Sequence, residues 1–247
     1  MRSGLSARHL SFLETGRSQP SRQALAAIAE ALDVPLRERN RLFEAAGYAP
    51  AYRQTPLASD EMAHIRRLLT FILQRHEPYG AVVLDRYWNM VMSNAAAGHG
   101  LRTFSDPSLW DGDRANLLKL MLHPLGIRRC IANWDDVSRH FVLRAHRELG
   151  NAKDDPAAVQ LLNDIHGYPG VPERPFGVAR ALASDLLLPI HLEKDGVGIR
   201  LFTTIMTLGT PQDVTLQELR IETFFPADEE SDAILSRAMV RVQKSPI

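Results

Sequence analysis

The amino-acid sequence predicts an α+β fold, in which an all-helical N-terminal module precedes a larger domain with a five-stranded antiparallel sheet and helices. Three observations support this prediction. Apolar residues recur at helical spacing up to about residue 46. That periodicity is lost between Gly47 and Ser59, where Pro50 and Pro56 occur. The remaining chain then shows the pattern of two short strands, a mostly helical middle and three further strands.

Length and composition place the chain among globular proteins. Its 247 residues correspond to one large domain or two unequal ones, at about 150 residues per domain. Hydrophobic residues make up 45% and charged residues 23%, which excludes collagen, a coiled-coil rod and a disordered chain. The single cysteine, Cys130, excludes an internal disulfide. No apolar run of about 18 residues and no secretory leader is present, so we expect a cytoplasmic protein.

Positive and negative charges balance overall but not locally. Lys and Arg number 29, as do Asp and Glu, so no global field favours nucleic acid, a membrane or an acidic substrate. Residues 1–57 carry a formal charge of +3 and the remaining residues carry −3. A small basic module followed by a slightly acidic body suits a binding head attached to a second domain. We therefore divide the chain into a module at 1–50, a linker at 51–59 and a domain at 60–247.

The N-terminal module has the start and stop signals of three short helices. Ser6 is placed to cap a first helix, and Gly16 supplies the left-handed residue that would end it. A second helix is expected from Ser21, because Leu25, Ile28, Ala29 and Leu32 follow at helical spacing. Pro35 is placed to open a third helix, which Gly47 would close. Short helices separated by tight polar turns are typical of helix-turn-helix DNA readers.

The segments from Ser6 to Ser21 and from Ile28 to Val34 resemble the second half of an Xre-type helix-turn-helix domain, from the recognition helix to the last helix. The resemblance implies that the module binds double-stranded DNA. It assigns base contacts to Ala7, Arg8 and Phe12, flanking positions to Ser6, His9 and Ser11, and the phosphate-binding loop to Arg17, Ser18 and Gln19. Arginine can donate two hydrogen bonds to a guanine edge, whereas loop residues bind phosphate without reading sequence. Composition alone favours the alternative, a solvated polar helix face.

The module departs from the Xre pattern at its start. The family domain has about two helices before the recognition helix, and here only Met1 to Leu5 precede it. Leu10 and Leu13 would then lack packing partners, which marks an interface, a truncation or a misplaced start. We favour a truncated or misassigned start, so that Met1 is not the true first residue. A protein that begins at Met1 is expected to bind DNA weakly, because phosphate contacts of the missing helices supply much of the affinity.

A long amphipathic helix is expected from Asp60 to about His76. Apolar residues recur on one face of it, at Ile65, Leu68, Leu69, Ile72 and Leu73. This face packs either on the helix's own domain or on the same helix of a second subunit. Because helix-turn-helix readers usually bind DNA as two-fold dimers, we expect a homodimer.

The strand pattern of the larger domain covers residues 81–84 and 89–93, then 186–193, 197–208 and 219–225. Asp195-Gly196 is a strong hairpin signal between the third and fourth strands. Residues 95–183 are expected to form helices and loops, and a final helix is expected after Asp228. A sheet of this kind with helices can enclose a small molecule on its concave side.

Four segments of this domain resemble the MmyB-like ligand-binding domain, a PAS-like domain that follows Xre heads in bacterial transcription regulators. They are Leu84 to Ala96, His123-Pro124, Trp134 and, most specifically, Gly209 to Asp228. The resemblance implies a one-component regulator whose pocket binds an apolar small molecule, such as a fatty acyl chain, and thereby changes operator affinity. It specifies neither the ligand, nor the operator, nor whether genes are activated or repressed.

Eight large apolar side chains are candidates to line such a pocket: Met90, Met92, Phe104, Trp110, Leu118, Met121, Phe202 and Met206. Methionine packs adaptably around irregular ligands, and Phe202 and Met206 share a strand face. Residues of these types are more often plain core residues. Asn94 can bond a turn or a ligand head group, with the turn favoured. His123, Trp134 and Arg200 are candidates to hold a carboxylate, although Arg200 can be a solvated strand residue.

Catalysis and metal binding find little support, so we expect a protein that is not an enzyme and holds no cofactor other than a bound fatty acid or similar ligand. No zinc spacing, nucleophile elbow, P-loop or dinucleotide-binding glycine pattern occurs. Cys130 fits a small buried hydrophobe, and Glu218 and Glu222 fit surface carboxylates of a strand. The alternative to a DNA-binding regulator is a sensor or interaction module that lacks a working DNA-binding domain and acts by pairing with complete paralogues.

Overall fold

The computed structural model describes residues 4–150, 154–173 and 187–244, which form two compact units. Unit 1 comprises Met1–Ala63 and Leu208–Glu218, and unit 2 comprises His64–Thr207 and Leu219–Ile247. The domain boundaries expected at residues 50 and 60 stay a prediction. Segment 208–218 groups with the N-terminal residues although it lies far along the chain, which sequence patterns did not anticipate.

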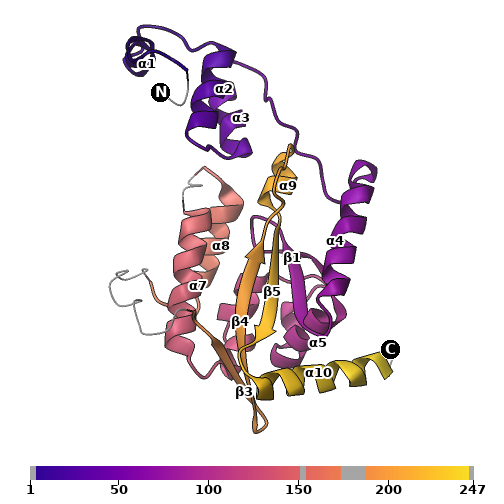
Figure 1. Cartoon of the computed structure of the whole chain (residues 1–247). Helices are drawn as coiled ribbons and strands as arrows, with labels where there is room; N and C mark the ends of the chain where they lie inside the picture. The colour runs from indigo at the N-terminus through magenta and orange to yellow at the C-terminus, as the bar shows by residue number, and fades with distance from the viewer. Residues whose placement is uncertain (1–3, 151–153, 174–186, 245–247) are drawn as a thin grey trace. The chain divides into compact units, whose positions relative to one another are not determined.

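Unit 1 is built from short helices with the caps that the sequence predicts. Its elements are α1 (Ala7–Glu14), α2 (Arg22–Ala31), α3 (Leu36–Ala45), the 3₁₀ turn η1 (Asp60–Met62) and α9 (Val214–Glu218) (Figure 1). The Oγ atom of Ser6 accepts from the His9 N–H, and that of Ser21 accepts from the Ala24 N–H. Gly16 and Gly47 follow the ends of α1 and α3 with φ of 69° and 81°. The predicted helix signals are therefore confirmed.

The interior of unit 1 lies mainly between α2 and α3. Ala24 and Ala29 of α2 are buried, as are Leu36 and Phe43 of α3. The guanidinium of Arg22 lies 5.0 Å from the centre of the Phe43 ring and covers it. By contrast, no residue of α1 is buried. The side chains of α1 are thus available to a partner.

Unit 2 contains a five-stranded antiparallel sheet and helices, as predicted. After α4 (Ala63–Arg75), its elements are β1 (Gly80–Leu84), β2 (Met90–Ser93), α5 (Ala95–Phe104), η2 (Pro107–Leu109), α6 (Leu117–Leu122), η3 (Ile127–Cys130), α7 (Trp134–Leu149), α8 (Pro156–His166), β3 (Ile190–Lys194), β4 (Val197–Met206), β5 (Arg220–Pro226) and α10 (Glu229–Lys244). The strand order is β2-β1-β5-β4-β3. Two strands before the helical middle and three after it form one sheet, which is the arrangement behind the PAS-like prediction.

The hairpin expected at Asp195-Gly196 is confirmed. Both residues adopt positive φ, 51° and 78°, and β3 pairs with β4 on either side of them. The strand expected from residue 186 begins at Ile190. Residue 186 itself, and residues 174–183 of the predicted helical middle, lie outside the described residues.

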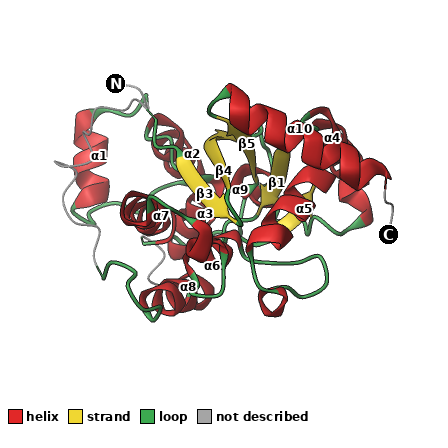
Figure 2. Ribbon diagram, turned by 90° about the horizontal axis from the view of Figure 1, so that it is seen from below, coloured by secondary structure: helices red, strands yellow, loops and turns green. Residues whose placement is uncertain are grey.

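The core of unit 2 lies between one face of the sheet and helices α5 to α8. Leu84, Ile190 and Leu201 from the strands pack with apolar residues of α6 and α7 in one buried cluster. Figure 2 shows helices on both sides of the sheet, with α4 on one side and α5, α6 and α8 on the other. Leu235 of α10 packs against the core on the α5 side. None of the described helices is long and apolar enough to cross a membrane.

Candidate functional site: an apolar cavity and an exposed helix

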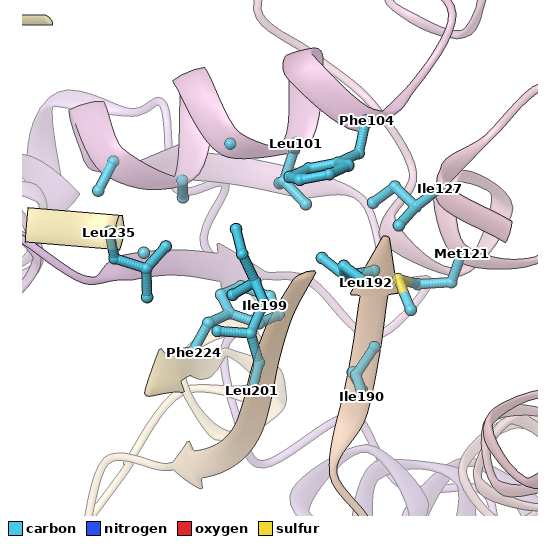
Figure 3. Close-up of a pocket in the computed structure, with 14 residues that line it drawn as sticks. Leu101, Phe104, Met121, Ile127, Ile190, Leu192, Ile199, Leu201, Phe224 and Leu235 are labelled. Atoms are coloured by element: carbon cyan, nitrogen blue, oxygen red, sulfur yellow. The ribbon is translucent and has the colours of Figure 1, made fainter. Parts of the chain in front are cut away.

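A cavity of about 80 Å³ lies in unit 2 between α5, η3 and strands β3 to β5. A single water needs about 10–15 Å³ of such space, so the cavity has room for a group of several heavy atoms. Its lining consists of Gly80, Ala96, Ala97, Gly100, Leu101, Phe104, Met121, Ile127, Ile190, Leu192, Ile199, Leu201, Phe224 and Leu235. Figure 3 shows the side chains of Leu101, Phe104 and Ile127 facing those of Leu192, Ile199 and Leu201 across it. Every lining residue is apolar, which favours an apolar occupant.

Local sequence explains why this space is open. Helix α5 begins Ala95-Ala96-Ala97-Gly98 and presents Ala96, Ala97 and Gly100 to the cavity, where larger side chains would fill it. At Gly80 on β1, an added Cβ would lie 3.3 Å from the Ala97 Cα, so the strand packs closely on the start of α5. Small residues therefore fix the position of the helix and leave room further along it.

Two of the eight candidate lining residues, Phe104 and Met121, line the cavity. Met90 and Leu118 are buried in the core, Met92 is half-buried on β2, and Trp110 donates from Nε1 to the Ser105 Oγ. Phe202 stacks on Phe225 at 5.5 Å, and Met206 is 36% exposed. Strand alternation explains the last two, because Phe202 and Met206 share the face opposite Ile199 and Leu201. Contact of Phe104 or Met121 with a ligand stays a prediction.

The sequence contained a signal for lining residues that was missed. Ile190 pairs with Leu201, and Leu192 pairs with Ile199. These four apolar residues alternate with polar ones on the two arms of the Asp195-Gly196 hairpin, so they share one face. The hairpin signal and the alternation together place them opposite each other, whereas the methionines were chosen for their chemistry alone.

The polar candidates do not face the cavity. Asn94 caps α5: its Oδ1 accepts from the N–H groups of Ala81 and Ala97, and its Nδ2 donates to the carbonyls of Leu73 and Tyr79. All of its hydrogen-bonding capacity serves the fold, as the turn interpretation expects.

The other three polar candidates lie among side chains outside the cavity lining. The His123 ring lies edge-on to Tyr168 at 4.8 Å, and Trp134 stacks under the Arg128 guanidinium at 4.4 Å. Arg200 is 64% exposed and lies 3.7 Å from the Asp228 carboxylate. None of the three belongs to the cavity lining, so a carboxylate-binding role gains no geometric support.

The prediction that Glu218 and Glu222 are surface carboxylates of one strand is wrong. Glu222 is completely buried on β5, where its Oε2 lies 2.9 Å from the Arg144 Nη2 in an ion pair that lacks hydrogen-bond alignment. Glu218 belongs instead to helix α9 in unit 1. Alternation along β5 assigned Glu222 to a face but gave no means of telling that both faces are covered.

The exposed face of α1 carries most of the residues expected to bind DNA. Ala7, Arg8 and Ser11 are exposed, and His9 and Phe12 are half-buried. The Arg8 guanidinium lies 5.4 Å from the centre of the Phe12 ring one turn along the helix, which holds it on that face. A cation supported in this way can donate to base edges.

The loop after α1, in which the resemblance places the phosphate contacts, is closed by backbone hydrogen bonds. The backbone N–H groups of Arg17 and Ser18 both donate to the Phe12 carbonyl, which closes the helix end. The side chains of Arg17 and Gln19 are exposed, while Ser18 is half-buried with its Oγ donating to the Gln19 carbonyl. Contact of Arg17 with a DNA phosphate stays a prediction.

Segment 208–218 is held within unit 1 by polar contacts. Arg37 donates from Nε and Nη2 to both carboxylate oxygens of Glu218, at 2.6 and 2.8 Å. The Leu36 N–H donates to the Gln217 Oε1, and the Thr55 N–H donates to the Asp213 Oδ2. The segment lies inside the Gly209 to Asp228 motif. Residues of this motif therefore attach the segment to the helices of unit 1, a role that the sequence analysis did not assign to them.

No group of three or more potential metal ligands occurs among the described residues. The nearest arrangement is a pair, in which the Nε2 atoms of His146 on α7 and His166 on α8 lie 2.8 Å apart and share a hydrogen bond. Burial, followed by the neighbouring His166, lowers the pKa of His146. The hydrogen bond joins the two helices.

Two family comparisons cover most of the chain. The model of the MmyB-like transcription regulator ligand binding domain matches residues 65–238, and a helix-turn-helix model matches residues 1–39. Both describe regulator domains. A comparison with curated proteins found no match.

Proposed function

Because the chain belongs to the MmyB-like transcription regulator family and joins its ligand-binding domain to a helix-turn-helix, we propose that it senses an apolar acyl compound and changes its DNA affinity in response. The observation that carries this proposal is the cavity of unit 2, whose fourteen lining residues are all apolar. Such a lining favours a hydrocarbon group and offers nothing to a sugar or a nucleotide.

The cavity supports an acyl chain because its size and shape leave room for a flexible occupant. At about 80 Å³ it has space for several water-sized groups without rearrangement. Met121 is an adaptable side chain that can adjust to chains of different length. Each methylene moved from water into such a lining contributes about 0.8 kcal/mol.

The connection from cavity to DNA-binding module runs through the chain itself. Strands β4 and β5 contribute Leu201 and Phe224 to the lining. The segment between these strands, 208–218, folds as part of unit 1 and pairs there with Arg37 of α3. A ligand that favours one arrangement of β4 and β5 would thereby bias unit 1, which is the differential binding that a switch needs.

Pairing of two copies through α4 is part of the proposal. Leu68 and Phe71 on α4 are 46% and 56% exposed. Two-fold pairing would bury these side chains and would match the symmetry with which helix-turn-helix proteins read paired half-sites. Arg8 and Arg17 would then contact bases and phosphate respectively.

The cavity proposal is tested by calorimetric titration with saturated carboxylates from six to fourteen carbons. We expect affinity to rise about fourfold per added methylene, from about 0.8 kcal/mol each, until the cavity is full. Gly100→Leu should abolish the gain, because a Cβ at Gly100 meets no atom within 4 Å and the new side chain has open space to occupy.

The matched control is Gly98→Leu, on the same helix but outside the lining. It should bind every chain as the wild type does. Affinity independent of chain length, or equal binding by the Gly100 and Gly98 variants, would rule out the cavity as the acyl site.

A further inference from the structure

We propose that Lys194, at the end of β3, binds the acidic head group of the ligand, so that the protein selects acyl carboxylates over neutral chains of the same length; this inference rests on the proposed function. None of the lining residues can pair with a carboxylate, because all of them are apolar. An ionised head group buried there would have no partner, which is prohibitively costly. The head group must therefore lie at the rim, and the rim residues decide what it can be.

Lys194 occupies the next position after two lining residues on the same strand face. Successive side chains of β3 alternate, so Ile190, Leu192 and Lys194 point the same way. The first two line the cavity, and Lys194 ends the strand immediately before the Asp195-Gly196 turn. A chain lying along this row would bring its polar end beside the ammonium group.

Contacts across the cavity place the ammonium group at its edge. The Lys194 Nζ lies 6.0 Å from the centre of the ring of Phe104, a lining residue at the end of α5. It also donates to the carbonyl of Thr103, which holds the side chain over that end of the cavity. Figure 3 shows Phe104 pointing toward Leu192, the lining residue that precedes Lys194 on this face.

This end of the hairpin is open to solvent. Val197, which pairs with Lys194 across the turn, keeps 47% of its surface exposed, whereas Leu192 and Ile199, two pairs further from the turn, are buried. Among the residues that the structure describes, no carboxylate forms an ion pair with Lys194. Its charge is therefore available to an acidic ligand, and an anion can reach it without being fully desolvated.

The opposite end of the cavity is unfavourable for an anionic head group. There the Glu77 Oε1 accepts from the N–H groups of Ala95 and Ala96, the second of which lines the cavity. The Glu77 carboxylate at this end and the Lys194 ammonium at the other orient an anionic chain with its head toward Lys194.

The test compares decanoate with 1-decanol on the wild type, on Lys194→Met and on Arg200→Met, by competition with a fluorescent apolar probe. Lys194→Met keeps the apolar stem and removes the charge. We expect it to weaken decanoate about tenfold and 1-decanol less than twofold. Arg200→Met removes a positive charge from the neighbouring strand outside the lining and should change neither affinity. Lys194→Arg should retain the preference for the acid.

Three outcomes would overturn the inference. Equal binding of acid and alcohol by the wild type and the Lys194 variant would mean that the head group lies elsewhere. Equal weakening of both ligands by Lys194→Met would assign the side chain a packing role only. Failure of the folded wild type to bind either ligand would remove the proposed function itself, and a thermal melt of each variant distinguishes this from unfolding.

Discussion

Glu222 and Arg144 form an ion pair in the core of unit 2, where removing two charges from water has a high desolvation cost. Both side chains are at most 9% exposed, and Arg144 also donates to Glu148, which pairs in turn with Arg220. The guanidiniums of Arg144 and Arg220 lie 4.2 and 5.0 Å from the Trp88 ring, which is fully buried. Burial lowers the pKa of Arg220 to about 10, so the group still carries its charge at neutral pH. Two cations and two carboxylates therefore neutralise each other around one indole.

Breaking this arrangement on one side should destabilise unit 2. Glu222→Gln leaves Arg144 with one carboxylate partner instead of two in an apolar setting, and we expect a loss of about 3 kcal/mol in the free energy of unfolding. The double variant Arg144→Met/Glu222→Leu removes both charges and leaves Glu148 paired with Arg220, so it should recover most of the loss. Urea unfolding measures both. A single-variant cost below about 1 kcal/mol would show that the pair is not coupled.

At the scale of elements, the most consequential contact is the one that attaches α9 to α3 within unit 1. The Arg37–Glu218 pair is bidentate, and its side chains are only 21% and 20% exposed. Such pairs are stronger and more directional than ion pairs in solvent. The contact links residues 181 positions apart in sequence, so it determines where the segment between β4 and β5 is held.

Arg37→Met should loosen this attachment without unfolding the module. We expect hydrogen exchange of the amides of residues 214–218 to quicken about tenfold, which corresponds to about 1.4 kcal/mol for a partly buried charged pair. Arg41→Met on the same helix is the control, because the Arg41–Glu38 pair is 38% and 45% exposed and lies within α3. If both variants left the exchange of these amides unchanged, the pair would not be what holds the segment.

Local signals in the sequence predicted much of the molecule, and their limits are physical. The caps at Ser6 and Ser21 and the hairpin at Asp195-Gly196 depend on neighbouring residues, and all three are confirmed. The burial of Glu222 depends on helices that cover its strand, and strand alternation carries no information about them. The docking of segment 208–218 depends on a partner far away in the chain, which no local pattern encodes.

The same distinction applies to the candidate site. Phe104 and Met121 were predicted among the lining residues, but six of the eight candidates lie elsewhere. Apart from Phe224, the residues that were missed are small or aliphatic, such as Gly100 and Ile199, and their role follows from how the elements pack around the cavity. A cavity is a property of how elements meet. The residue types therefore predicted that the cavity is apolar, but they did not identify most of the residues that line it.

For the whole molecule, a regulator needs its ligand and its DNA to be linked. Any factor by which an acyl ligand changes DNA affinity must also appear as the factor by which DNA changes ligand affinity. The chain itself connects the two, because β4 and β5 line the cavity and the segment between them folds with unit 1. Control of DNA affinity by a ligand therefore depends first on which compound occupies the cavity.

The most direct test of that claim is methyl NMR of the protein labelled with ¹³C at its seven methionines, titrated with decanoate. Met121 lines the cavity, whereas Met206 is exposed and Met92 lies on β2 outside the lining. We predict that the Met121 methyl shifts and shows nuclear Overhauser contacts to the ligand chain, while Met92 and Met206 remain unchanged. Saturation that moves Met206 or Met92 and leaves Met121 unaffected would contradict the account.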